Sequence, residues 1–190
     1  MRSLTSLVIL TLLFAVFTGC KADRKYTAAV VGCRFANADN SGKAPVNTTA
    51  DTISAKAYAI TFTQLGIITG HDNGADIKEE NQYNVTNEVL RLSVTAVNDF
   101  DSIHPAGTNL KDIFYQLTDT IKYNLLPLGD GRGYPTFNFR VRKSDLDTML
   151  YTQWLVLMQP PRAPGSYSFA INVDLADSTR YNDTIHIYLK

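Results

Sequence analysis

The most constraining feature of this chain is an alternation of apolar and polar residues with a period of two near its C-terminus. Between 167 and 175 every second residue is apolar, and small or polar residues stand between them. Successive side chains of a β-strand point to opposite faces of a sheet, so this spacing predicts a strand with one buried face. The stretch 185–189 repeats the pattern, as do segments around Tyr58 and Leu92. The sequence therefore predicts an all-β fold.

Turn-forming residues separate the alternating runs. Glycine and proline gather at 129–133 and at 160–165, as is typical of connections between strands. Helical pattern is confined to two places, where Asn109 caps a short helix over 110–116 and Ser144 caps another over 145–150. About seven strands without a regular alternation of helices predict an immunoglobulin-like antiparallel β-sandwich, with one or two short helices in its connections.

We expect one set of alternating residues to fill the space between the two sheets. Trp154 shares a face with Val156 and Met158 by alternation, which predicts that it is the core tryptophan of the sandwich. The alternative is an exposed Trp154 that stacks on a sugar ring, with a glycan as the partner. The expected core consists of Tyr58, Ile60, Phe62, Leu92, Val94, Trp154, Phe169, Ile171, Val173, Ile185 and Ile187.

The first 19 residues have the form of a bacterial lipoprotein signal peptide. Arg2 precedes an apolar run over 7–17 that is too short to span a bilayer comfortably, and a lipobox-like Phe-Thr-Gly-Cys ends at Cys20. We expect cleavage before Cys20, acylation of its thiol, and one sandwich domain over 20–190 behind a short tether. The anchor implies the outer membrane as the partner surface. Residues 21–25 lack the acidic run that is expected after the cysteine of a surface-exported lipoprotein. This favours the periplasmic face of the membrane over the cell surface.

The second cysteine has no intrachain partner if the first carries lipid. Cys33 lies in an expected strand over 26–35, where a free cysteine usually acts as a small buried hydrophobe. The alternatives are an exposed reactive thiol or a bridge between Cys20 and Cys33. No spacing of cysteine and histidine indicates zinc.

Charge and motif content argue against two classes of function. Lysine and arginine together number 18, as do aspartate and glutamate, so no basic face is expected for nucleic acid. The chain lacks a G-x-S-x-G motif, and the glycines at 129–133 lack the context of a nucleotide-binding loop. We expect a non-enzymatic binding or structural module without a cofactor. The alternative is a small envelope hydrolase or a glycan-processing accessory that uses paired carboxylates.

Two acidic clusters are candidates for ligand or metal sites. The acidic stretch 72–80 resembles a calcium loop, but its spacing misses the EF-hand pattern, so no metal site is predicted. Asp99, Asp101 and His104 form the second cluster. One interpretation is a ligand loop, to which Trp154 is added as a further candidate. The other is an ordered corner of the sandwich, turned at 105–107, with Leu110 and Phe114 buried beneath it.

The segment 90–114 carries a family resemblance. It runs from the alternating strand that contains Leu92 through Asn98, Asp99 and Phe100 into the His104-Pro105-Ala106-Gly107 turn. With the lipobox and the early tyrosine-containing strand, it resembles small lipoproteins of Bacteroidetes that carry an uncharacterised immunoglobulin-like domain. The resemblance implies the fold and the compartment, and no activity or ligand. A fimbrial or adhesin subunit with a protein partner is the alternative, because exposed final strands suit strand exchange.

A recurring triplet places Asp before Ser or Thr, followed by an apolar residue or Thr. It resembles the acceptor triplet of the O-glycosylation that Bacteroidetes apply to exported proteins. The competing explanation is that polar-to-apolar transitions at strand starts produce such triplets by themselves. The candidate acceptors are Thr52, Ser102, Thr120, Thr148, Ser178 and Thr184.

Overall fold

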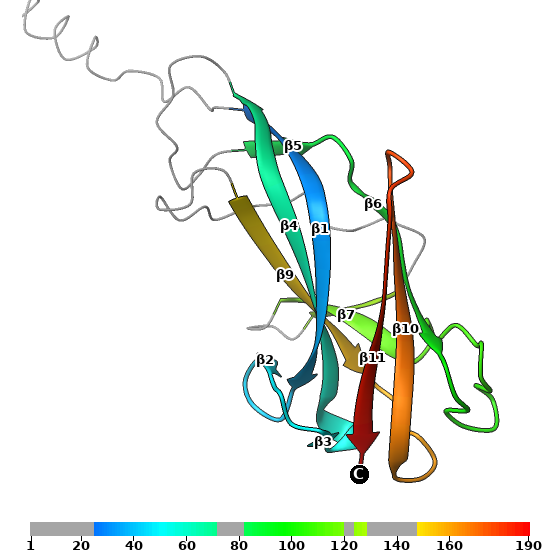
Figure 1. Ribbon diagram of the computed structural model, residues 1–190. Coiled ribbons are helices and arrows are strands. Elements are labelled where there is room, and N and C mark those ends of the chain that lie inside the picture. The colour runs from blue at the N-terminus through cyan, green and yellow to red at the C-terminus, as the bar shows by residue number, and fades with distance from the viewer. Residues whose placement is uncertain (1–24, 72–81, 120–123, 129–147) are drawn as a thin grey trace, which may run out of the picture.

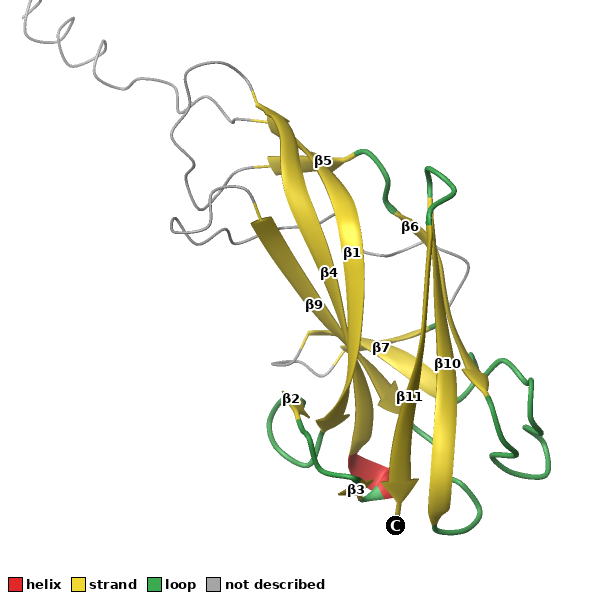
Figure 2. Cartoon of the chain, viewed as in Figure 1, coloured by secondary structure: helices red, strands yellow, loops and turns green. Residues whose placement is uncertain are grey.

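The computed structural model describes residues 25–71, 82–119, 124–128 and 148–190. These residues form two β-sheets that face one another (Figure 1). All strand pairs are antiparallel except two short ones, β1 with β5 and β11 with β3. The described residues contain no α-helix and one single-turn 3₁₀ element, η1 (Ala55–Ala57), drawn red in Figure 2. The predicted all-β sandwich is confirmed.

The larger sheet has seven strands. Its order is β2-β1-β4-β9-β7-β8, and β5 pairs with the start of β1. The strands are β1 (Lys25–Asp39), β2 (Val46–Asn47), β4 (Tyr58–His71), β5 (Gln82–Val85), β7 (Phe114–Asp119), β8 (Asn124–Pro127) and β9 (Thr148–Leu157).

The smaller sheet has four strands in the order β3-β11-β10-β6. Its last two strands in sequence form a long hairpin, in which Phe169 lies opposite Ile185 and Tyr167 opposite Ile187. The strands are β3 (Thr52–Ile53), β6 (Val89–Ala96), β10 (Gly165–Leu175) and β11 (Arg180–Leu189).

The apolar core lies between the inner faces of the two sheets. Phe169 is at its centre, with ring centroids 5.7 Å from Tyr58, 5.4 Å from Phe114 and 6.1 Å from Phe100. The alternation predicts these faces because β10 buries every second residue from Tyr167 to Leu175. The core prediction is confirmed for Tyr58, Ile60, Phe62, Leu92, Val94, Phe169, Ile171, Val173, Ile185 and Ile187.

The prediction that Trp154 belongs to this core is wrong. Leu155 and Leu157 are the buried residues of β9 in the main core, so Trp154 points to the opposite, outer face of the larger sheet. There it is half-buried against a small cluster that contains Leu117 and Val156. The alternation was right, but both faces of β9 carry large apolar residues. The pattern alone therefore did not indicate which face is inside.

The two predicted helices are not confirmed. Residues 111–113 form a turn, and β7 begins at Phe114, so the interval 110–116 is a turn followed by a strand. Asn109 does accept a hydrogen bond from the Lys111 backbone, as a capping residue does, but the turn does not continue into a helix. The second interval, 145–150, ends inside β9, and its first three residues lie outside the described residues.

The described residues hold eleven strands rather than about seven. The additional strands are two to four residues long, too short to show a sequence period. The start of β10, one of the long strands, has a hydrogen bond of the tyrosine-corner type, which is typical of immunoglobulin-like sandwiches. The Tyr167 hydroxyl donates to the Ala163 carbonyl oxygen at 2.7 Å and fixes the entry of the chain into β10.

Candidate functional site

The main candidate site is a seam on the side of the sandwich where an edge of each sheet is left open. We define the seam as residues 31–36 of β1 and residues 180–187 of β11. β11 pairs with β10 along its whole length, but on its other side the described strands pair with it only through β3, at Tyr188 and Leu189. β1 and β11 run beside each other in Figure 1. The seam is therefore the place where neither sheet has a further strand within the described residues.

The backbone groups of β11 that face the seam can be assigned from the pairing. The Tyr188 and Lys190 N–H groups donate to Asp51 and Ile53, so they point away from β10. Backbone direction alternates along a strand. Asn182, Thr184 and His186 therefore also direct their N–H and C=O groups to the free edge. A row of backbone groups that no described strand pairs with is a template for another strand.

Side-chain amides occupy part of the edges. The Asn37 Nδ2 donates to the His186 carbonyl oxygen at 2.9 Å and holds the lower end of the seam together. At the upper end, Asn87 accepts from the Val30 N–H and donates to the Val30 carbonyl oxygen, at 2.7 and 2.9 Å. The Asn87 side chain thus makes the two hydrogen bonds to the Val30 backbone that a residue of a neighbouring strand would make. The open stretch of β1 lies between these two contacts.

The inner-face side chains along the seam are partly apolar and partly acidic, whereas the basic residues Arg34 and Arg180 stand at the alternate, outer-face positions of their strands. Cys33, Phe35 and Tyr181 are half-buried and pack against the main core. Asp183 occupies an inner-face position of β11, between Tyr181 and Ile185, yet it is exposed. Its carboxylate accepts from the Thr184 N–H at 2.7 Å and so lies toward the free edge. Asp177 stands near the top of the seam, where it accepts from Asn87 at 2.9 Å.

Cys33 is a free cysteine, as expected. Burial raises the pKa of its thiol to about 12. The thiolate is the reactive form of cysteine, so Cys33 is almost fully protonated near neutral pH. The side chain acts as an apolar group in the seam, which agrees with the predicted hydrophobic role.

The corner at 98–114 is an ordered structure, as one of the two interpretations predicted. Phe100, Leu110, Ile113 and Phe114 are all buried. The backbone of 107–110 bonds to the end of β6, for example from the Leu110 N–H to the Val94 carbonyl oxygen at 2.8 Å. This segment therefore covers part of the outer edge of β6.

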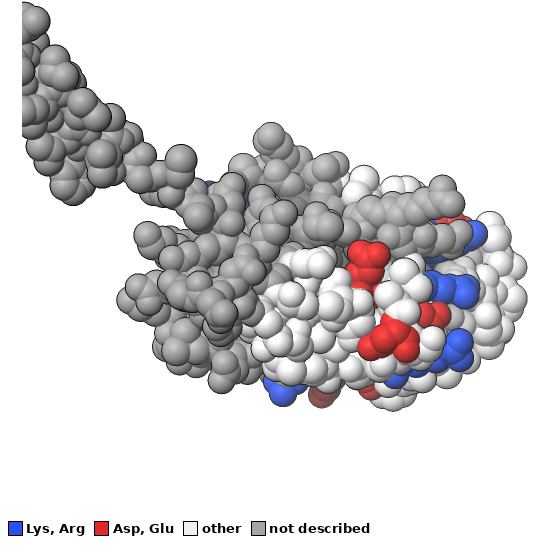
Figure 3. All heavy atoms as spheres, turned by 90° about the horizontal axis from the view of Figure 1, so that it is seen from above, with Lys and Arg blue, Asp and Glu red and all other residues white. Residues whose placement is uncertain are grey.

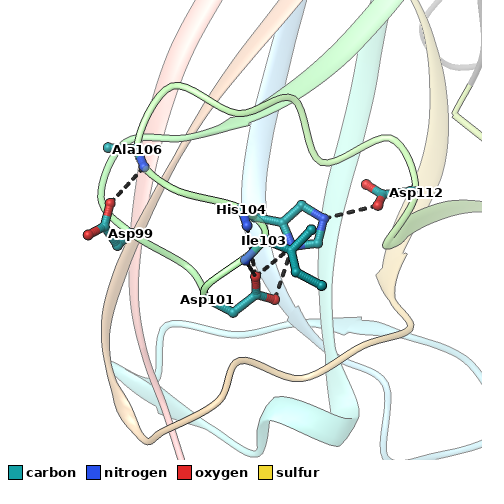
Figure 4. A network of polar contacts seen from close by, with 6 residues as sticks. All are labelled: Asp99, Asp101, Ile103, His104, Ala106 and Asp112. Carbon is teal, nitrogen blue, oxygen red and sulfur yellow. Dashed lines mark hydrogen bonds and ion pairs between the residues drawn. The ribbon is translucent and has the colours of Figure 1, made fainter.

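A histidine with two carboxylate partners holds this corner (Figure 4). His104 is 4% exposed, with its Nδ1 2.9 Å from Asp101 and its Nε2 3.0 Å from Asp112. The Asp101 carboxylate also accepts from the Ile103 and His104 N–H groups, both at 2.8 Å. A neutral imidazole can donate from only one nitrogen, so this geometry fits the protonated ring.

The electrostatics of the corner agree with a charged histidine. The hydrogen bonds to Asp112 and then to Asp101 raise the pKa of His104, against the opposing effect of burial. Burial opposes ionisation of Asp101, but the hydrogen bonds from His104 and the backbone outweigh it and lower the pKa of that carboxyl. The His104 hydrogen bond lowers the pKa of Asp112. All three shifts favour the charged forms of the side chains, as their mutual hydrogen bonds do.

The structure brings together only part of the predicted ligand loop. Asp101 and His104 are in contact, whereas Asp99 accepts from the Ala106 N–H at 2.8 Å and faces away from them (Figure 4). Trp154 lies on the outer face of the other sheet. Both ring nitrogens of His104 have protein partners. The corner is therefore a structural network in its described geometry.

The remaining predicted site residues are in several places. Cys20, the acidic stretch 72–80 and Thr120 lie outside the described residues, and nothing is described of the Thr148 side chain in β9. The other candidate acceptors, Thr52, Ser102, Ser178 and Thr184, are all exposed. The described residues contain no group of acidic, histidine or cysteine side chains that could hold a metal ion. They also contain no helix long and apolar enough to cross a membrane.

Two features of the structure were not predicted from the sequence. One is the seam, because pairing partners cannot be read from periodicity. The other is a set of glutamines on the inner face of the larger sheet, at Gln64, Gln116 and Gln153, each at most 4% exposed. Within the described part of the chain, neither amide atom of Gln64 has a hydrogen-bond partner. The signal for Gln64 was present, since it continues the inward series that contains Ile60 and Phe62.

The described part of the end of the molecule that lies at the top of Figure 1 carries both acidic and basic side chains. Figure 3 shows acidic and basic side chains interspersed on the face seen from above.

No protein-family model and no curated protein sequence matches the chain. It is weakly similar to two solved structures titled BspA_C_mut and BspA_C_WT, at 12% identity to each and with TM-scores of 0.31 and 0.25. Each match covers 82% of this chain and 46% or 50% of the other. The chain thus spans about half the length of those structures. At such TM-scores they assign it neither a family nor a role.

Proposed function

We propose that this protein is a lipid-anchored, non-enzymatic module of the bacterial cell envelope that binds a protein partner along the free edge of β11. The observation that carries the proposal is the long edge of β11 in the seam, with which no strand of the described residues pairs. Addition of an extended segment to such an edge is a common mode of recognition, in which main-chain hydrogen bonds give affinity. The acylated Cys20 would hold the module at the membrane, on its periplasmic face.

The anchor and the edge are tested separately. Cys20→Ser should leave an uncleaved, unacylated precursor that moves from the detergent phase to the aqueous phase. Unchanged detergent partitioning of this variant contradicts the anchor. Protease treatment of intact cells distinguishes the two membrane faces, and digestion of the folded protein there contradicts the periplasmic one.

The edge is tested by a matched pair of substitutions at Thr184, whose N–H faces the seam. Thr184→Pro removes this donor without removing a hydrogen bond to β10, because proline is tolerated on the solvent side of an edge strand. Thr184→Val keeps the N–H and removes only the hydroxyl. Both variants must first show wild-type circular dichroism and thermal unfolding.

The measurement is photo-crosslinking in cells from an unnatural residue at Asn182, on the free edge. We expect a protein adduct that persists with Thr184→Val and is lost with Thr184→Pro. The same crosslinker at Ser102, in the exposed corner, is the control position. An adduct that is insensitive to Thr184→Pro, or no adduct at Asn182, contradicts the proposal.

A further inference from the structure

We infer that the segment that pairs with β11 is basic, with a lysine or arginine between two apolar residues, spaced every second position. This inference rests on the proposed function and names the chemistry of its partner. The free edge gives the position of the incoming strand. The side chains on the inner face of β11 then determine what that strand must carry.

The pleat of the sheet determines which residues meet. A strand added to β11 places alternate side chains on the same face as Tyr181, Asp183 and Ile185. Directly opposite residues of paired strands have their Cβ atoms about 4.5–5.5 Å apart. The residue opposite Asp183 is therefore in contact range of its carboxylate. The neighbours two positions away face Tyr181 and Ile185, next to the half-buried Cys33 and Phe35.

The carboxylate of Asp183 is placed to meet an incoming cation. It now accepts from the Thr184 N–H, on the side of the free edge. A partner carbonyl oxygen that pairs with Thr184 would replace this hydrogen bond. The carboxylate would then be free to accept from a side chain of the added strand, and a lysine or arginine opposite supplies a donor together with the opposite charge. Asp177 is a second exposed acidic side chain near the top of the seam, and the basic residues Arg34 and Arg180 stand at the alternate positions of their strands.

The same carboxylate disfavours other occupants. Pairing of β11 with β11 of a second copy would place Asp183 opposite another Asp183 or opposite an apolar inner-face residue such as Tyr181 or Ile185. Like charges directly opposite each other destabilise a sheet. An inward-pointing charge on an edge strand is a known device against pairing with unselected strands. Asp183 therefore selects for a basic partner and against self-association.

The experiment uses two fluorescent peptides and the intact protein. In one peptide valine, lysine and valine alternate with threonines, and in the other glutamate replaces the lysine. Fluorescence anisotropy measures their binding to the wild type, Asp183→Lys, Asp183→Asn, Thr184→Pro and Thr184→Val. We expect the wild type to prefer the lysine peptide by up to about fivefold, as for a cross-strand ion pair. The preference should weaken as salt is raised.

The variants separate the inference from the proposed function. Asp183→Lys should reverse the preference, and Asp183→Asn should abolish it. Thr184→Pro should weaken the binding of both peptides, whereas Thr184→Val should leave the binding of both unchanged. Equal binding of both peptides to the wild type, still sensitive to Thr184→Pro, overturns the basic partner and leaves strand addition standing. Binding of neither peptide, or binding that Thr184→Pro does not affect, contradicts strand addition at β11 itself.

Discussion

The Asn37 side chain joins the two sheets across the seam by donating to the His186 carbonyl oxygen at 2.9 Å. Its Oδ1 also accepts from the buried Tyr58 hydroxyl at 2.8 Å. One amide therefore links the edge of β1, the edge of β11 and a core tyrosine. This contact closes the lower end of the seam and limits how far a partner strand can enter.

Asn37→Ala should lower the free energy of unfolding by about 1–3 kcal/mol, because it leaves the buried Tyr58 hydroxyl without an acceptor. Urea unfolding measures the change. Tyr58→Phe removes the donor instead and should cost about 0.5–1.5 kcal/mol. The double variant should be more stable than the sum of the single effects predicts. Additive effects would mean that the two side chains do not act together.

Phe169→Ala should destabilise the protein by about 3–5 kcal/mol, because its ring contacts Tyr58, Phe100 and Phe114 at the centre of the core. The control is Val97→Ala, at a side chain that is 49% exposed, which should change stability by no more than about 0.5 kcal/mol. A loss below about 1 kcal/mol at Phe169 is incompatible with the described core.

The sandwich and most of its core could be predicted because local alternation reports directly on burial. In β10 the period of two places Phe169, Ile171 and Val173 on one face, and the structure buries all three. The prediction was wrong where both faces of a strand are apolar, as around Trp154. It was also wrong where a turn residue such as Asn109 can begin either a helix or a tight turn.

The candidate site could not be predicted in the same way. The free edge of β11 depends on which strands pair with it, and the pair of β11 with β3 joins residues more than 130 positions apart, such as Tyr188 and Thr52. The sequence did indicate part of the His104 network, because Asp101 and His104 belong to the cluster that was predicted there. Its partner Asp112, however, is placed by the turn that replaces the predicted helix.

A substitution at the buried Gln64 should raise the free energy of unfolding, whereas those at Asn37 and Phe169 should lower it. Neither of its side-chain polar atoms has a hydrogen-bond partner among the residues that the structure describes, and the residue is 1% exposed. Gln64→Met keeps a similar shape and removes the cost of burying the amide, so it should raise the free energy of unfolding by about 1 kcal/mol. Gln159→Met, at an exposed position, is the matched control and should be neutral. Destabilisation at Gln64 would show that its amide is satisfied in solution.

The last prediction concerns the pH dependence that the His104 network gives to stability. The pKa of His104 is raised in the folded protein, so folding favours its protonated form. The resulting stabilisation is fully present below the unfolded value of about 6.5 and is lost as pH rises through the higher folded value. The pKa values of Asp101 and Asp112 are lowered. Their contribution is present above the unfolded value of about 3.9 and is lost as pH falls through the lower folded values.

The network should therefore stabilise the corner most between about pH 4 and 6.5. The difference in unfolding free energy between the wild type and His104→Gln should be larger at pH 5.5 than at pH 9, as measured by urea unfolding. His186→Gln, at an exposed histidine that contacts the Ser168 hydroxyl, is the control for a change of the same type at the surface. Amide exchange across 110–114 should accelerate in His104→Gln at pH 5.5, because Asp112 then loses its link to the turn. A difference between wild type and His104→Gln that does not change with pH would show that the imidazole is not protonated between its two carboxylates.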